Sequence, residues 1–182
     1  VTVEYGTIID SPAIAMKKRV GYVSKDRDVE SLCLNASIED NISIAGMSEF
    51  AINNFLILKN REKKYVNHQI EELSIKCAGR DQSVSQLSGG NKQKVVFGKW
   101  IGSEILILDC PTRGVDIGVK QAMYQLMVRL KNEGKSILMI SEELPELIGM
   151  SDRILIMKNG EVSAEFERSE TLSDAQIIEY MI

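Results

Sequence analysis

The sequence predicts an α/β fold in which a mixed β-sheet is interrupted by an inserted helical segment. Apolar runs typical of buried strands, Ile105–Leu108 and Ile137–Ser141, alternate with helical patterns, as in a parallel sheet with crossover helices. The Asn159-Gly160 pair between two strand patterns predicts a tight hairpin and adds antiparallel strands. Residues 25–86 are mostly polar with apolar positions at helical spacing, so they predict a helical subdomain.

The first 24 residues are expected to form one part of the core. β-Branched residues dominate Val1–Ile9 and predict extended structure. Ser11-Pro12 is typical of a helix start, followed by a short helix over Ala13–Lys18. The segment Arg19–Ser24 then predicts a strand.

The helical subdomain is expected to contain two or three helices. Its clearest signal is the helical spacing of Tyr65, Val66, Ile70 and Leu73. From residue 87 to 182 the alternation of helix and strand patterns resumes.

Several helix ends are predicted in this last part. A helix is expected over Asn91–Ile101 and another over Asp116–Glu133, the latter stopped by Gly134. Ser173 and Gln176 have the spacing of a capping box for a final helix.

Composition and charge exclude several classes of protein. The net charge of −4 gives no basic excess for nucleic-acid backbones. Three cysteines without CxxC spacing and a single histidine, His68, argue against a disulfide framework, a zinc site and a histidine-based triad. The apolar runs are too short to span a bilayer, and no signal-peptide pattern is present. Because the chain begins at Val1 without methionine, we expect it to be a piece of a longer protein.

The first chemistry-bearing segment is Leu87-Ser88-Gly89-Gly90-Asn91 at a predicted helix start. Two glycines allow a ligand to approach the backbone, and the unpaired N–H groups with the positive end of the helix dipole suit a phosphate. Taken alone, the glycines favour a simple turn before a surface helix, because short motifs match by chance.

The second segment is a buried strand pattern that ends in Asp109. A carboxylate at the carboxyl end of such a strand lies where α/β sheets bind ligands and can hold Mg²⁺ through water. The alternative for Asp109 is a helix N-cap after the strand.

In this order, the LSGGN motif, the ILILD strand and the segment Pro111–Asp116 resemble the signature, Walker B and D-loop of ABC ATPase cassettes. The longer run Pro111–Gly118, with Gly149–Arg153, is similar to the second cassette of ribose- and galactose-type importers, in which two cassettes are fused. The resemblance implies a RecA-like P-loop NTPase core, incomplete in this chain, with ATP and Mg²⁺ as cofactors.

The resemblance also implies a set of site residues. Ser88, Gly89, Gly90 and Asn91 would contact ATP held by the other cassette, Asp109 would hold Mg²⁺ through water, and Asp116 would belong to the D-loop. It implies a second ABC cassette and membrane permease subunits as partners, a solute-binding protein as an indirect partner, and no nucleic acid. The implied location is peripheral, on the cytoplasmic face of the membrane.

Three positions depart from the pattern of an active cassette. Cys110 stands where a glutamate polarises the attacking water, Glu142 stands at the switch histidine, and Lys25 stands at the Q-loop glutamine. A thiol is mostly protonated at neutral pH, and an ionised carboxylate cannot donate a hydrogen bond to a phosphate. A simpler interpretation of Cys110, compatible with the first, is a small buried thiol beneath the strand tip.

No Walker A pattern GxxxxGK[ST] occurs in the chain. For Gly134-Lys135-Ser136 to belong to this pattern, a glycine would have to stand five residues before Gly134, but that residue is Arg129. We therefore predict a helix C-cap at Gly134-Lys135-Ser136. The signature is thus expected to serve the partner's site, while the chain's own site is degenerate and the chain alone is inactive.

Two other classes of protein stay open. One is a non-transport ABC ATPase of the DNA-repair or translation type, against which the acidic charge and the absence of coiled-coil heptads argue. The other is a non-catalytic dimerisation module, because a sheet with an open edge can pair with another chain.

Overall fold

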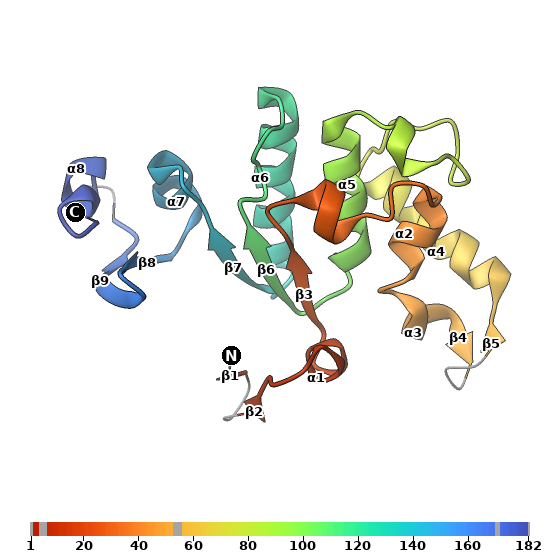
Figure 1. Cartoon of the computed structure of the whole chain (residues 1–182), viewed down its shortest axis with the longest axis horizontal. Helices are drawn as coiled ribbons and strands as arrows, with labels where there is room; N and C mark the ends of the chain where they lie inside the picture. Colours follow the sequence, from red (N-terminus) through yellow and green to blue (C-terminus); the bar gives the residue numbers. More distant parts are fainter. Residues whose placement is uncertain (1, 4–6, 53–55, 170–171, 182) are drawn as a thin grey trace. The chain divides into compact units, whose positions relative to one another are not determined.

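The computed structural model describes residues 2–3, 7–52, 56–169 and 172–181 (Figure 1). The chain divides into two compact units, Val1–Leu138 and Met139–Ile182. The domain boundaries predicted at residues 24/25 and 86/87 concern divisions within the first unit and stay predictions.

The first unit alternates short strands and helices. Its elements are β1 (Thr2–Val3), β2 (Thr7–Ile8), α1 (Pro12–Lys17), β3 (Val20–Val23), the π-helix η1 (Arg27–Ser31), α2 (Ile38–Ser43), α3 (Met47–Phe50), β4 (Ala51–Ile52), β5 (Leu56–Ile57), α4 (Lys59–Glu72), the 3₁₀-helix η2 (Val84–Gln86), α5 (Gly89–Trp100), β6 (Ile105–Asp109) and α6 (Ile117–Asn132). The strand β7 (Ser136–Ile140) contains the division between the units.

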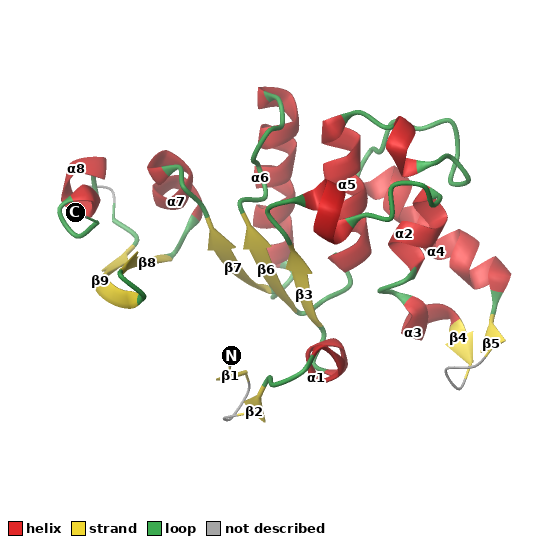
Figure 2. Ribbon diagram, in the orientation of Figure 1, coloured by secondary structure: helices red, strands yellow, loops and turns green. Residues whose placement is uncertain are grey.

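The largest described sheet, here called the central sheet, has three strands in the order β3-β6-β7 (Figure 2). β3 and β6 run parallel, with Val20 opposite Ile105 and Val23 opposite Leu108. Val23, Leu106 and Leu108 are buried, as expected for apolar strands covered by helices. The predicted strands at 19–24, 105–108 and 137–141 are therefore present.

Two helices supply much of the core of the first unit. Their buried apolar side chains are Val95, Val96 and Phe97 of α5 and Met123, Leu126, Met127 and Leu130 of α6. The α6 positions recur at the helical period and form one apolar face, whereas those of α5 are consecutive, so α5 is buried on more than one side.

The described residues of segment 25–86 form three α-helices, in agreement with the prediction of two or three. α2 contacts both α4 and α5, and α3 contacts α4. Val66 and Leu73 are buried, and the ring of Tyr65 lies 5.7 Å from that of Phe50. The π-helix η1 and the β4–β5 pair were not predicted.

Helix ends follow the predicted capping residues. The Ser11 hydroxyl accepts a hydrogen bond from Ile14 N at 3.4 Å, at the start of α1. At the end of α6, Gly134 adopts φ +88 and Lys135 N donates to Leu130 O at 3.1 Å. This 6→1 bond with a left-handed glycine is a Schellman motif, so the Gly134-Lys135-Ser136 segment is a C-cap, as predicted.

The structure describes only some of the N-terminal residues that were predicted to be extended. β1 and β2 pair antiparallel, with Thr2 opposite Ile8 and Val3 opposite Thr7. Residues 1 and 4–6 of the predicted extended segment lie outside the described residues.

The second unit contains α7 (Leu144–Met150), β8 (Arg153–Lys158), β9 (Glu161–Glu167) and α8 (Asp174–Ile178). Asn159 at φ 53 and Gly160 at φ 84 form the turn between β8 and β9, which confirms the hairpin prediction. Ser173 N donates to Gln176 Oε1 at 3.0 Å, as a capping box requires. Ile154, Ile156 and Ile177 form its small core.

Across both units, the described helices include none that is long and apolar enough to cross a membrane.

Candidate functional site

Two predicted site segments leave the central sheet at the same edge. Val23 of β3 lies opposite Leu108 of β6 in a parallel pair. The chain therefore passes to Lys25 from one strand and to Asp109 and Cys110 from its neighbour on one side of the sheet. The carboxyl edge of a parallel sheet is where such folds bind ligands.

Asp109 ends β6 and is half-buried. The hydroxyl of Tyr22, on β3, donates to Asp109 Oδ2 at 3.3 Å. Burial, and then the negative charge of Asp109, raise the pKa of Tyr22 above its usual value. Tyr22 thus stays a neutral hydrogen-bond donor to this carboxylate at physiological pH. Sequence reasoning missed Tyr22, and its only signal is its alternation with the buried Val23.

Asp109 offers a single carboxylate to a metal ion at this edge of the sheet. The described residues contain no group of three or more histidine, cysteine, aspartate or glutamate side chains able to hold a metal. Mg²⁺ usually keeps several waters and binds through one or two carboxylates and substrate phosphates. A single carboxylate at a sheet edge fits that role and does not fit an all-protein metal cage.

Cys110 follows Asp109 in an uncommon backbone conformation, with φ +46. Its carbonyl accepts a hydrogen bond from Arg113 N at 3.1 Å, which closes a turn over Cys110–Arg113 with Pro111 at the second position. Cys110 is reduced and half-exposed. The simpler prediction of a buried thiol beneath the strand tip is wrong in its burial, because Cys110 is only partly buried.

The signature segment Leu87–Asn91 forms the start of α5. Ser88 is its N-cap and accepts hydrogen bonds from Asn91 N at 3.5 Å and Asn91 Nδ2 at 3.0 Å. Asn91 Oδ1 accepts from Lys76 N at 2.9 Å, which fixes the helix start to the loop after α4. Ser88 itself is exposed, so its hydroxyl is accessible to another molecule.

The two glycines of the signature also serve packing within the chain. A Cβ on Gly90 would lie 2.6 Å from Val119 Cγ2, in the first turn of α6. A Cβ on Gly89 would lie 3.0 Å from Nη2 of Arg27. The sequence suggested only ligand approach as a reason for these glycines, whereas the structure shows that Gly90 also admits a neighbouring helix.

Asp116 of the D-loop is the N-cap of α6. Its Oδ1 accepts a hydrogen bond from Val119 N at 3.0 Å. Since Val119 is also the residue against Gly90, the starts of α5 and α6 lie side by side. The structure thus brings together the signature and the D-loop, which are separated by about 25 residues of sequence.

Glu142 belongs to the second unit and is exposed. It lies between β7 and α7, in a turn where Glu143 N donates to Ser141 Oγ at 3.1 Å. The Ser141 hydroxyl in turn donates to a carboxylate oxygen of Glu146. These bonds fix the local conformation around Glu142.

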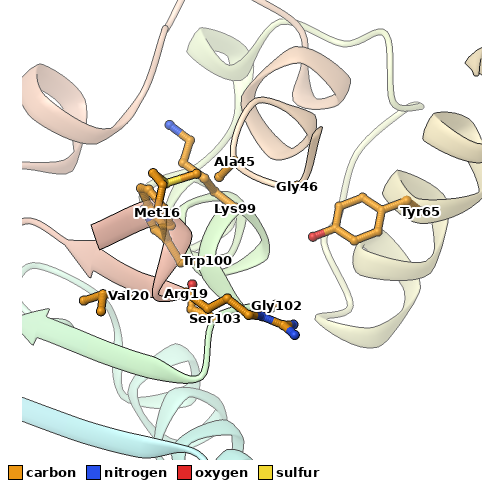
Figure 3. A pocket seen from close by; sticks show the side chains of 10 residues that line it. All are labelled: Met16, Arg19, Val20, Ala45, Gly46, Tyr65, Lys99, Trp100, Gly102 and Ser103. Atoms are coloured by element: carbon orange, nitrogen blue, oxygen red, sulfur yellow. The ribbon is translucent and has the colours of Figure 1, made fainter. Parts of the chain in front are cut away.

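A small cavity of about 60 Å³ lies at the opposite end of β3 (Figure 3). It is lined by Met16, Arg19, Val20, Ala45, Gly46, Tyr65, Lys99, Trp100, Gly102 and Ser103. Burial lowers the pKa of Lys99, whose Nζ donates to Ser31 O at 2.5 Å. None of the predicted site residues is among those that line this cavity.

Comparison with known proteins shows sequence relatives among sugar importers. A ribose import ATP-binding protein of Clostridium tetani is 40% identical over 176 residues, which are 96% of this chain and 35% of that protein. The corresponding protein of Bacillus subtilis is 44% identical over 170 residues, 92% of this chain and 34% of that protein. The chain thus spans about a third of the length of the curated relatives it matches. No protein-family profile matches the chain.

Solved structures show the fold. A dimeric ATP-binding cassette in a post-hydrolysis state, bound to ADP and Pi, matches with a TM-score of 0.70 at 20% identity, covering 87% of this chain and 68% of that one. An ATP-binding cassette of an ABC transporter in its ADP conformation matches with a TM-score of 0.70 at 21% identity, covering 93% and 70%. The chain has the fold of ABC ATPase cassettes, and its predicted resemblance to ribose import ATP-binding proteins is confirmed.

Proposed function

We propose that this chain is part of the ATP-binding subunit of an ABC importer, in which ATP binding and hydrolysis drive sugar uptake. The ribose import relatives favour this function over a non-transport ATPase. The chain aligns with about a third of those proteins, so the rest of the subunit would supply the Walker A loop and the other cassette. Permease subunits would place the complex at the cytoplasmic face of a membrane.

The mechanistic part of the proposal rests on a contrast between two segments, the signature at the start of α5 and the turn that follows β6. Ser88 is exposed at a capped helix start, with Gly89 and Gly90 behind it, as a phosphate site requires. Cys110, in contrast, offers a thiol where a catalytic base is needed. We infer that the signature completes the ATP site of the partner cassette, and that the chain's own site binds nucleotide with little hydrolysis.

Two residues of the first unit define this weak site. Asp109 would hold Mg²⁺ through water, and Mg²⁺ would neutralise phosphate charge there. Lys25 would place a cation where the Q-loop has a neutral amide. In the second unit, Glu142 would place an anion at the position of the switch histidine, and an anion repels a phosphate.

The test uses the full-length subunit with its permease. Replacing Ser88 by tyrosine should abolish ATP hydrolysis, because the bulky ring blocks the phosphate site. Cys110→Glu should change the rate little, since the hydrolysing site lies on the other cassette. Loss of a working general base costs about 10²–10⁴-fold in rate. A gain of that size from Cys110→Glu would therefore refute a non-hydrolysing role for this site.

The isolated chain has its own test. Without a Walker A sequence it should bind ATP poorly and hydrolyse none. Calorimetry that measured micromolar ATP affinity for the 182-residue chain would contradict this proposal.

A further inference from the structure

The π-helix η1 places two charged side chains on the signature helix. Arg27 and Asp28 are its first two residues and follow the end of β3 closely. Arg27 Nη1 donates to Gln93 Oε1 at 3.4 Å, and Asp28 Oδ2 pairs with Lys92 Nζ at 3.2 Å. Adjacent residues of η1 thus contact adjacent residues of α5. π-Helical turns are rare and occur often at functional sites.

Arg27 also reaches a third segment. The same Nη1 donates to the carbonyl oxygen of Arg113, in the D-loop, at 3.2 Å. Its Nη2 lies where a Cβ on Gly89 would come within 3.0 Å. The Arg27 side chain is 20% exposed, so it is largely enclosed by these three segments.

The partners of Arg27 are themselves fixed. Gln93 is buried, with 3% of its surface exposed. The Arg113 backbone closes the turn on Cys110 through its own N–H. A planar guanidinium with several donors can bind two acceptors at a fixed separation, so it sets the distance between them.

We propose that Arg27 is a positioning residue that holds the first turn of the signature helix in register with the D-loop. This rests on the function proposed above, in which the signature acts at the partner's ATP site. Arg27 lies in η1, which follows Lys25 and the end of β3. Its side chain therefore joins three segments: η1, the start of α5 and the D-loop that follows β6. A conformational change at this chain's own site is then transmitted to the signature helix through the Arg27 side chain.

The first experiment measures ATP hydrolysis by the full-length subunit with its permease. Arg27→Ala should lower kcat at least ten-fold, because displacement of a phosphate-binding group by about 1 Å costs up to 10²-fold. KM for ATP should change less than three-fold, a rough bound for a residue that contacts no nucleotide. Arg27→Lys should restore part of the rate, since an ammonium can still donate to Arg113 O.

A matched control is Arg129→Ala. Arg129 also joins two segments, since its Nη2 pairs with Glu72 Oε1 of α4 at 2.7 Å, but it lies in the later part of α6. This variant should keep the parental kcat. An equal loss of kcat in both variants would show a general effect of removing an arginine and would overturn the proposal.

Hydrogen exchange on the same full-length protein gives a readout that needs no activity. The Lys92 amide, bonded to Ser88 O at 2.9 Å, and the Arg113 amide should both exchange faster in Arg27→Ala. They should be unchanged in Arg129→Ala. Unchanged exchange at both amides in Arg27→Ala would overturn the positioning role, as would faster exchange with a parental kcat.

The two proposals fail in different ways. If Ser88→Tyr retains full activity, the signature's role at the partner site is wrong, whatever Arg27→Ala does. If Ser88→Tyr is inactive and Arg27→Ala hydrolyses ATP at the parental rate, only the role of Arg27 is wrong.

Discussion

The contact between Gly90 and Val119 gives a quantitative test of how α5 packs against α6. A Cβ at Gly90 would lie 2.6 Å from Val119 Cγ2, so the two helix starts must separate by roughly 0.8 Å to reach ordinary contact. Overpacking of this kind costs about 1–3 kcal/mol. An alanine in a helix gains up to about 1 kcal/mol over glycine. We expect Gly90→Ala to lower the free energy of unfolding by about 1 kcal/mol.

A double-mutant cycle isolates the contact. Val119→Ala should cost about 1 kcal/mol by itself, since Val119 is half-buried. In the double variant the clash is absent, so the stability should return close to that of the parent. The coupling between the two sites is then about 2 kcal/mol, within the range for residues in contact.

The assay is urea unfolding of the 182-residue chain, followed by circular dichroism. Gly79→Ala is the matched control, because a Cβ there meets nothing within 4 Å, and its effect should stay within about 0.5 kcal/mol. Additive effects of Gly90→Ala and Val119→Ala, or a stabilising Gly90→Ala, would refute the packing argument.

Two further predictions concern the sheet edge and the signature. Well below pH 10.0, the usual pKa of tyrosine, Tyr22 is neutral in both folded and unfolded states, so its stabilising contribution is complete there. That contribution is lost as the pH rises through the raised folded pKa. In unfolding experiments, Tyr22→Phe should not show this loss of stability at alkaline pH. In an absorbance titration, Asp109→Asn should lower the pH midpoint of Tyr22 ionisation, and an unchanged midpoint would contradict the contact. Asn91→Ala should cost about 1–2 kcal/mol, because the Lys76 N–H loses its acceptor. Faster exchange of the Lys76 amide, and its restoration in Asn91→Asp, would confirm that cause.

Local signals predicted the secondary structure well. Ser11 and Ser173 cap helices as their positions indicated, because a capping side chain bonds to backbone within three residues. Asn159-Gly160 forms the predicted turn, since both residues tolerate positive φ. The motif order Leu87–Asn91 and then Asp109–Asp116 predicted the fold that the comparisons confirm.

What the sequence alone determined were these local elements, the motifs and the departures at Lys25, Cys110 and Glu142. Only the tertiary structure decided which distant residues meet. The contacts of Arg27 span 66 residues to Gln93 and 86 to Arg113, and no periodicity encodes such separations. The packing role of Gly90 is likewise visible only in the tertiary structure. The absence of a Cβ matters for packing only because Val119 of α6 lies against this position.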